Sequence, residues 1–158
     1  MRRRFDQLDE TWPAGLGKRL GAMVYDGLLV LAIWIGITTA HLAWARLVLE
    51  LPPEAVGAGL AQVLSLRLAL ALSAYAFFAF FWTRGGMTLG MQSWRLRVQA
   101  DDGHSITWTQ SLIRYLVAWV SLAAFGLGYL WILFDEQKRS WSDIASGTRV
   151  VVVPKADR

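Results

Sequence analysis

The chain has 158 residues, of which 55% are hydrophobic and 18% are charged, and its mean hydropathy is positive. Soluble domains of this length rarely have so apolar a composition, which favours an integral membrane protein. The absence of cysteine excludes disulfides and thiol chemistry, and two histidines leave little for a metal site. The net charge of +4 does not indicate a nucleic-acid surface, because the basic residues flank apolar stretches.

The first apolar stretch predicts a membrane helix over residues 20–40, after a cytoplasmic arm at 1–18. About 20 residues can cross roughly 30 Å of hydrocarbon as a helix. A cleaved signal peptide is the alternative, because Ala43-Trp44-Ala45 has the small-x-small form of a cleavage site. The long, partly acidic arm and the carboxylate of Asp26 inside the apolar run favour the membrane helix.

A second apolar stretch, residues 63–82, predicts another membrane helix with an aromatic end that suits a membrane interface. The period then changes within the loop at 84–110. Residues 94–99 and 106–109 alternate apolar with polar side chains, and Asp102-Gly103 between them is a tight-turn pair. This pattern predicts a β-hairpin, and the arginines around it place the loop in the cytoplasm.

The third apolar stretch, residues 112–134, is interrupted at Gly126-Leu127-Gly128 and precedes a basic tail at 135–158. A single crossing would place this tail outside. Its positive charge, and a β-rich run at 148–153 suited to pairing with 94–99, place it in the cytoplasm. A segment that breaks at the glycines and turns back, or lies partly in the interface, satisfies both observations. We favour that arrangement, and one straight crossing remains the plainer alternative. The predicted fold is therefore an all-α helical bundle of about three apolar segments with a small cytoplasmic β-hairpin or sheet.

Asp26 is the most informative residue for function. It lies about 10 Å along the predicted helix from Arg19, and a carboxylate at membrane depth costs roughly 2.5–3.5 kcal/mol on insertion scales. Arg19 stands seven residues earlier, on nearly the same helical face. Two interpretations stay open: a proton or cation relay at Asp26, and a buried structural ion pair.

Four features stand in order along the chain: Arg19, Asp26, the loop Gly86-Met87-Thr88-Leu89-Gly90, and Asp143 ahead of Gly147-Thr148. Together they resemble the RDD family of small bacterial membrane proteins. The resemblance runs from about Pro13 to Val153 and maps the family's arginine and two aspartates to Arg19, Asp26 and Asp143. Met91 stands where a lysine commonly follows the loop, and Ser142 where a histidine often precedes the last aspartate.

The resemblance implies a multi-pass protein of the bacterial inner membrane with a cytoplasmic N-terminus. Cation/proton antiport has been proposed for some family members, which fits an intramembrane aspartate. Three short spans are too few to enclose a pathway. We therefore expect transport of protons, monovalent cations or a small solute in a homo-oligomer or with another membrane protein; an accessory or assembly subunit of a larger complex is the alternative.

The remaining candidates suggest structural roles. Asp143 is expected to cap a helix or to pair with Arg19 or Arg114. Gly86, Thr88 and Gly90 are read mainly as a turn, because the loop lacks the Gly-Lys-Ser/Thr ending of a phosphate-binding loop. No serine, histidine and acid stand in a suggestive order, and the carboxylate pairs are adjacent in sequence, so we expect neither an enzyme nor a cofactor.

Overall fold

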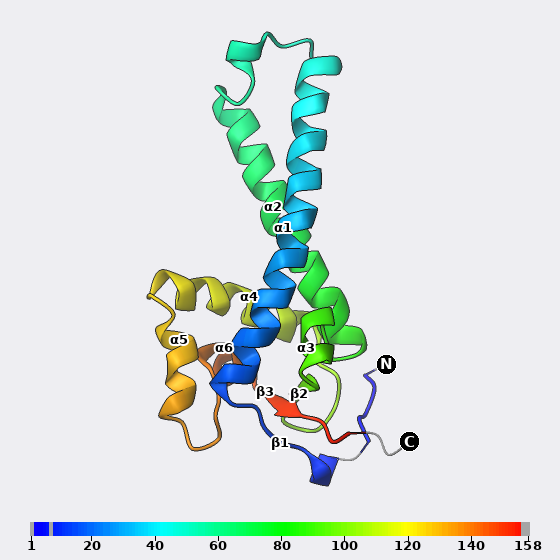
Figure 1. The fold of residues 1–158 in the computed structure, drawn as a ribbon, viewed down its shortest axis with the longest axis vertical. Coiled ribbons are helices and arrows are strands. Elements are labelled where there is room, and N and C mark those ends of the chain that lie inside the picture. The colour runs from blue at the N-terminus through cyan, green and yellow to red at the C-terminus, as the bar shows by residue number, and fades with distance from the viewer. Residues whose placement is uncertain (1, 7, 156–158) are drawn as a thin grey trace. The chain divides into compact units, whose positions relative to one another are not determined.

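The computed structural model describes residues 2–6 and 8–155 (Figure 1). Parts of the predicted arm (residues 1 and 7) and of the predicted tail (156–158, including Arg158) lie outside the described residues. The chain divides into two compact units, one of Met1–Asp26 with Phe78–Arg158 and the other of Gly27–Phe77. In chain order the elements are η1 (Leu8–Glu10), β1 (Trp12–Pro13), α1 (Leu16–Leu47), η2 (Pro53–Ala55), α2 (Leu60–Arg84), α3 (Leu89–Ser93), β2 (Leu96–Ala100), α4 (Trp108–Ala123), α5 (Leu127–Leu130), η3 (Trp131–Leu133), α6 (Trp141–Ser146) and β3 (Thr148–Val152).

Helices α1 and α2 are the two helices in the described part of the chain that are each long and apolar enough to cross a membrane. They include the predicted stretches of 20–40 and 63–82 and extend beyond them at both ends. Within the unit Gly27–Phe77 the indole Nε1 of Trp34 donates a hydrogen bond of 2.9 Å to the carbonyl oxygen of Leu70. This hydrogen bond links α1 to α2 within the unit.

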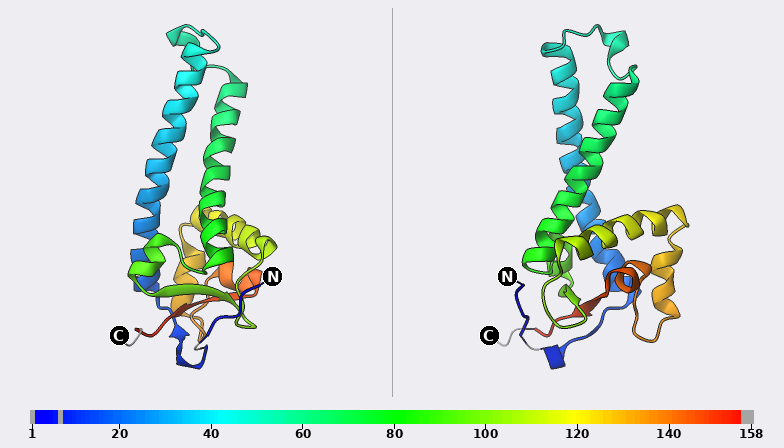
Figure 2. Two further views of the ribbon diagram at one scale, coloured as in Figure 1. Left: turned by 90° about the vertical axis from the view of Figure 1, so that its right-hand side faces the viewer. Right: turned by 180° about the vertical axis from the view of Figure 1, so that it is seen from behind.

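The third apolar stretch is broken, as its glycines predict. Helix α4 and the following α5–η3 segment meet at 106°, and the change of direction is plain in Figure 2. At the break Phe125 and Gly126 have φ values of 57° and 78°, a left-handed backbone that ends the helix. The described part of the chain thus has two candidate spans, or three if the bent pair is counted as one.

The three strands form an antiparallel sheet in the order β1-β3-β2. Strand β3 pairs with β2 over five residues, with Val150 opposite Val98, so the predicted pairing of the tail with 94–99 is confirmed. One face of the sheet supplies Leu96, Val98 and Val152 to the apolar core. All three strands belong to the unit that also contains the beginning of α1 and the end of α2.

The predicted hairpin is wrong in its second arm. Residues 106–109 form no strand: Thr107 caps α4 through a reciprocal pair of hydrogen bonds with Gln110, and the helix begins at Trp108. The turn at Asp102-Gly103 is present, since the Gly103 amide donates to the Ala100 carbonyl at 2.9 Å. After it the chain meets the N-terminal arm, through an isolated bridge between His104 and Arg4. In this segment of only four residues, the capping box determines the structure, and the alternation of apolar and polar side chains does not.

Candidate functional site

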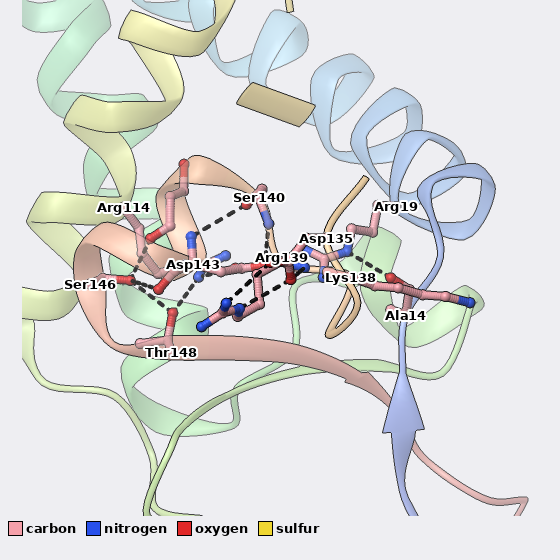
Figure 3. Close-up of polar contacts among 11 residues, drawn as sticks. Ala14, Arg19, Arg114, Asp135, Lys138, Arg139, Ser140, Asp143, Ser146 and Thr148 are labelled. Carbon is pink, nitrogen blue, oxygen red and sulfur yellow. Dashed lines mark hydrogen bonds and ion pairs between the residues drawn. The ribbon is translucent and has the colours of Figure 1, made fainter. Parts of the chain in front are cut away.

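Asp143 lies at the centre of a buried ionic cluster, and its side chain is fully inaccessible to solvent. Its Oδ2 accepts a hydrogen bond of 2.6 Å from Nη1 of Arg19, and its Oδ1 accepts one of 2.6 Å from Nη1 of Arg114 (Figure 3). The carboxylate also caps helix α6, because Oδ2 accepts from the Ser140 amide at 3.0 Å while the Asp143 amide donates to the Ser140 hydroxyl. We call Arg19, Arg114 and Asp143 the Asp143 cluster.

The two arginines of the Asp143 cluster have further contacts besides Asp143. Arg19 also donates from Nε to the carbonyl of Ala14 at 3.1 Å and from Nη2 to the carbonyl of Lys138 at 2.6 Å. The Arg114 guanidinium donates to the hydroxyl of Thr148 and lies over the ring of Trp82, 5.1 Å from its centre. The cluster thereby joins the start of α1, the end of α2, α4, α6 and β3.

Charge, not burial, decides the state of Asp143. Burial alone would raise the pKa of this carboxyl, but the guanidiniums of Arg114 and Arg19 together hold the pKa below its ordinary value. Asp143 is therefore a carboxylate at neutral pH. A buried anion between two buried cations holds elements together, because removing the anion leaves two guanidiniums buried without a counter-charge.

Asp26 is held in a second arrangement, which we call the Asp26 clamp and which consists of Asp26, Thr88 and Gly90. Asp26 is 4% exposed. Its Oδ2 accepts a hydrogen bond from the Thr88 hydroxyl, and its Oδ1 accepts one of 2.8 Å from the Gly90 amide. Thr88 is also the N-cap of α3, since its Oγ1 accepts from the Met91 amide at 3.2 Å. Both oxygens of Asp26 are thus bound by neutral donors.

The two glycines of the loop are required by close approach. Gly86 has φ +71°, and a Cβ there would lie 2.6 Å from the carbonyl oxygen of Val98. At Gly90 a Cβ would lie 2.9 Å from Cγ of Asp26. Besides turning the chain, the loop therefore packs closely against α1 at Asp26.

Comparison with known proteins agrees with this pattern of residues. The profile of the RDD family matches residues 13–147. The chain belongs to the RDD family. Searches of curated proteins and of solved structures find no match. The matched range of this RDD protein contains every member of both the Asp143 cluster and the Asp26 clamp.

Arg19 and Asp26 lie on the same helix of this RDD protein but have different partners. Arg19 pairs with Asp143, and within residues 2–6 and 8–155 no basic side chain forms an ion pair with Asp26. Spacing along one helix cannot reveal that a partner 124 residues away competes for the arginine. The charge compensation considered for Asp26 through Arg19 is absent from these contacts.

Two further residues of the RDD site were not singled out from the sequence. Ser140 has a readable signal, because Ser-x-x-Asp is the pattern of a capping box. Trp82, which contacts Arg114, has none, because its role arises from tertiary packing. Thr148 belongs to the Gly-Thr motif, but its hydrogen bond with Arg114 also arises from tertiary packing. Met91 and Ser142, the two departures from the family's pattern, are both buried. The described part of the chain contains no group of three His, Cys, Asp or Glu side chains able to hold a metal ion.

Proposed function

We propose that this RDD protein is a transport component, not an enzyme, and that it exchanges a proton or a monovalent cation at Asp26. One observation carries the proposal: Asp26 is a buried carboxylate on a membrane helix, and among the described residues its hydrogen-bond donors are neutral. Intramembrane acids commonly mark ion pathways and proton relays. Asp143, with two arginines, is by contrast suited to a permanent structural role.

The chemistry of the clamp supports both states of the carboxyl group. A hydroxyl can donate and accept, so Thr88 can donate to the charged carboxylate and can accept from the protonated acid. The Gly90 amide can continue to donate to the other oxygen in either state. Proton exchange would then require rotation of one hydroxyl and no rearrangement of the backbone.

A cytoplasmic location of the arm and tail belongs to the same proposal. Four arginines lie outside the apolar middle of the spans: Arg84 at the end of α2, Arg95 before β2, Arg139 before α6 and Arg149 in β3. Lys and Arg remain on the cytoplasmic side during insertion, which supports this orientation. Two or three spans are too few to enclose a pathway, so the working unit would be a homo-oligomer or a complex with another membrane protein.

A role as an accessory or assembly subunit is the second candidate. It is favoured by the large apolar side chains that α1 exposes along its length, including Leu28, Leu31 and Ile35, because such a surface can pack against another membrane protein as well as against lipid. In that case Asp26 would only fasten the loop at 86–90 to α1.

Flux measurements in proteoliposomes test the proposal. We expect purified wild type to dissipate an imposed pH gradient when a monovalent cation gradient runs in the opposite direction across the membrane. We expect Asp26→Asn to abolish that flux. Asp102→Asn is the matched control, because it makes the same chemical change at an exposed carboxylate paired with Arg2. Thr88→Ser, which keeps the hydroxyl, should retain flux that Thr88→Val loses.

The outcomes separate the two candidates. Flux in the wild type that survives Asp26→Asn would refute the role of Asp26. A folded wild type without flux in any cation gradient, together with an unchanged set of co-purifying membrane proteins in Asp26→Asn, would favour the accessory subunit.

A further inference from the structure

Helix α4 has its polar face inside and its apolar face outside. Its buried residues include Ser111, Arg114 and Ser121, of which Arg114 belongs to the Asp143 cluster. The opposite face exposes large apolar side chains at Leu112, Leu116 and Trp119, spaced three or four residues apart. A soluble helix has the reverse arrangement, so the surroundings of this face are not bulk water.

The segment past the bend also exposes large apolar side chains. Phe125, at the break itself, is 94% exposed. We call the whole surface the apolar shoulder; its exposed members are Trp108, Leu112, Leu116, Trp119, Val120, Leu122, Phe125, Leu127, Leu130, Trp131, Leu133 and Phe134. The charged residues Asp135 and Glu136 follow directly, so the surface has a polar border.

The geometry of the bent pair opposes a straight crossing. Helix α4 has 16 residues, which give a length of about 24 Å at 1.5 Å per residue, less than the roughly 30 Å of hydrocarbon. The next helical segment leaves it at 106°. Neither arm alone can span the membrane, and the two together do not share an axis.

The sheet fixes where the chain goes afterwards. Strand β2 precedes α4 and strand β3 follows α6, and the two strands pair from Leu96 opposite Val152 to Ala100 opposite Thr148. Strand β1, which precedes α1, pairs with the other edge of β3. Each apolar segment of the chain is therefore preceded and followed by a strand of the same sheet. A backbone ladder of this kind cannot have its strands on opposite sides of a bilayer.

We infer that the apolar shoulder lies in the headgroup and acyl-chain boundary of the bilayer that α1 and α2 cross, and that the bent pair does not cross it. Exposed Trp108, Trp119 and Trp131 suit that occupant, because tryptophan favours the membrane interface. The three residues come from both arms of the pair, as expected if both arms lie near the plane of the interface. It follows that β1 and β3, and the residues that adjoin them, lie on one side of the membrane.

Site-directed labelling tests the topology, and the chain is convenient for it because it contains no cysteine. Glu10→Cys reports the arm, Lys155→Cys the tail, and Glu54→Cys the connection between α1 and α2. In proteoliposomes of uniform orientation, a membrane-impermeant maleimide should reach Glu10→Cys and Lys155→Cys from the same side and Glu54→Cys from the other. Labelling of Lys155→Cys from the side of Glu54→Cys would overturn the inference.

Depth measurements test whether the apolar shoulder contacts the lipid interface. A fluorophore on Leu116→Cys or Phe125→Cys, at a high ratio of phospholipid to protein, should be quenched several-fold more by lipids brominated near the headgroup than by lipids brominated near the chain end. Leu31→Cys, near the middle of α1, is the matched control and should show the opposite preference. Chain-end quenching at Phe125→Cys would indicate a crossing. No quenching at either shoulder position would show that protein covers the surface, from a second copy or another subunit. Either result would overturn the inference.

Discussion

The two buried carboxylates differ in what surrounds them. Asp143 has two guanidiniums at 2.6 Å, and Asp26 has a hydroxyl and an amide. The first arrangement favours permanent charge, and the second leaves the charge dependent on a proton or a bound cation. A substitution at each position should therefore produce a different defect: loss of folding stability at Asp143 and loss of flux at Asp26.

Replacing Asp143 by Asn is expected to lower the free energy of unfolding by about 3–5 kcal/mol, because Arg19 and Arg114 remain buried without their anion. Thermal unfolding in detergent micelles, followed by circular dichroism, measures the effect. Asp102→Asn removes an exposed ion pair with Arg2 and should leave the melting temperature nearly unchanged. Equal shifts of the melting temperature in the two variants would contradict the conclusion that Asp143 contributes more stability than an exposed ion pair does.

The stabilisation by Asp143 should disappear in acid. Its pKa in the folded protein lies below the ordinary aspartate value of about 3.9, so the unfolded chain takes up the proton first as pH falls. The contribution is complete above that ordinary value and is lost as pH falls through the folded-state pKa. The difference in melting temperature between wild type and Asp143→Asn should consequently be constant at neutral pH and shrink only in strong acid. A difference that shrinks between pH 8 and 6 would show that another group is titrating.

At the scale of elements, α3 and its loop should tolerate no side chain at Gly90. Gly90→Ala places a methyl group against Cγ of Asp26, which must separate α3 from α1 and break the Asp26 clamp. We expect loss of flux together with a lowered melting temperature. Gly85→Ala is the matched control, because its nearest neighbour would be 4.0 Å away. Normal flux in Gly90→Ala would mean that the clamp is not needed for transport.

The elements also show what the sequence could reveal. Apolar length predicted α1 and α2, and β-rich composition predicted that the tail pairs with residues 94–99. Alternation over four residues failed at 106–109, where the Thr107–Gln110 capping box was the better guide. The Asp26 clamp could not be derived, because Thr88 and Gly90 lie 62 and 64 residues away and turn chemistry does not specify a distant partner.

For the whole molecule, the division into two units suggests two kinds of stability. The unit that contains the sheet holds the Asp143 cluster and the apolar core around Val98 and Val150. The unit Gly27–Phe77 contains most of α1, the connection after it and most of α2, and few of its side chains are buried. Its backbone is therefore protected from hydrogen exchange mainly by helical hydrogen bonds and by lipid.

Hydrogen exchange in lipid nanodiscs, read by mass spectrometry, should separate the two units. Asp143→Asn is expected to accelerate exchange in peptides that cover β2, β3 and α4 by an order of magnitude or more, because the cluster's three charges all lie in that unit. Peptides from Gly27–Phe77 should exchange as in the wild type. The reciprocal variant, Trp34→Phe, removes the hydrogen bond to Leu70 and should affect only those latter peptides. If either variant accelerated exchange uniformly along the chain, the two units would be one cooperative structure, and the effect of Asp26 substitutions on flux could no longer be separated from global unfolding.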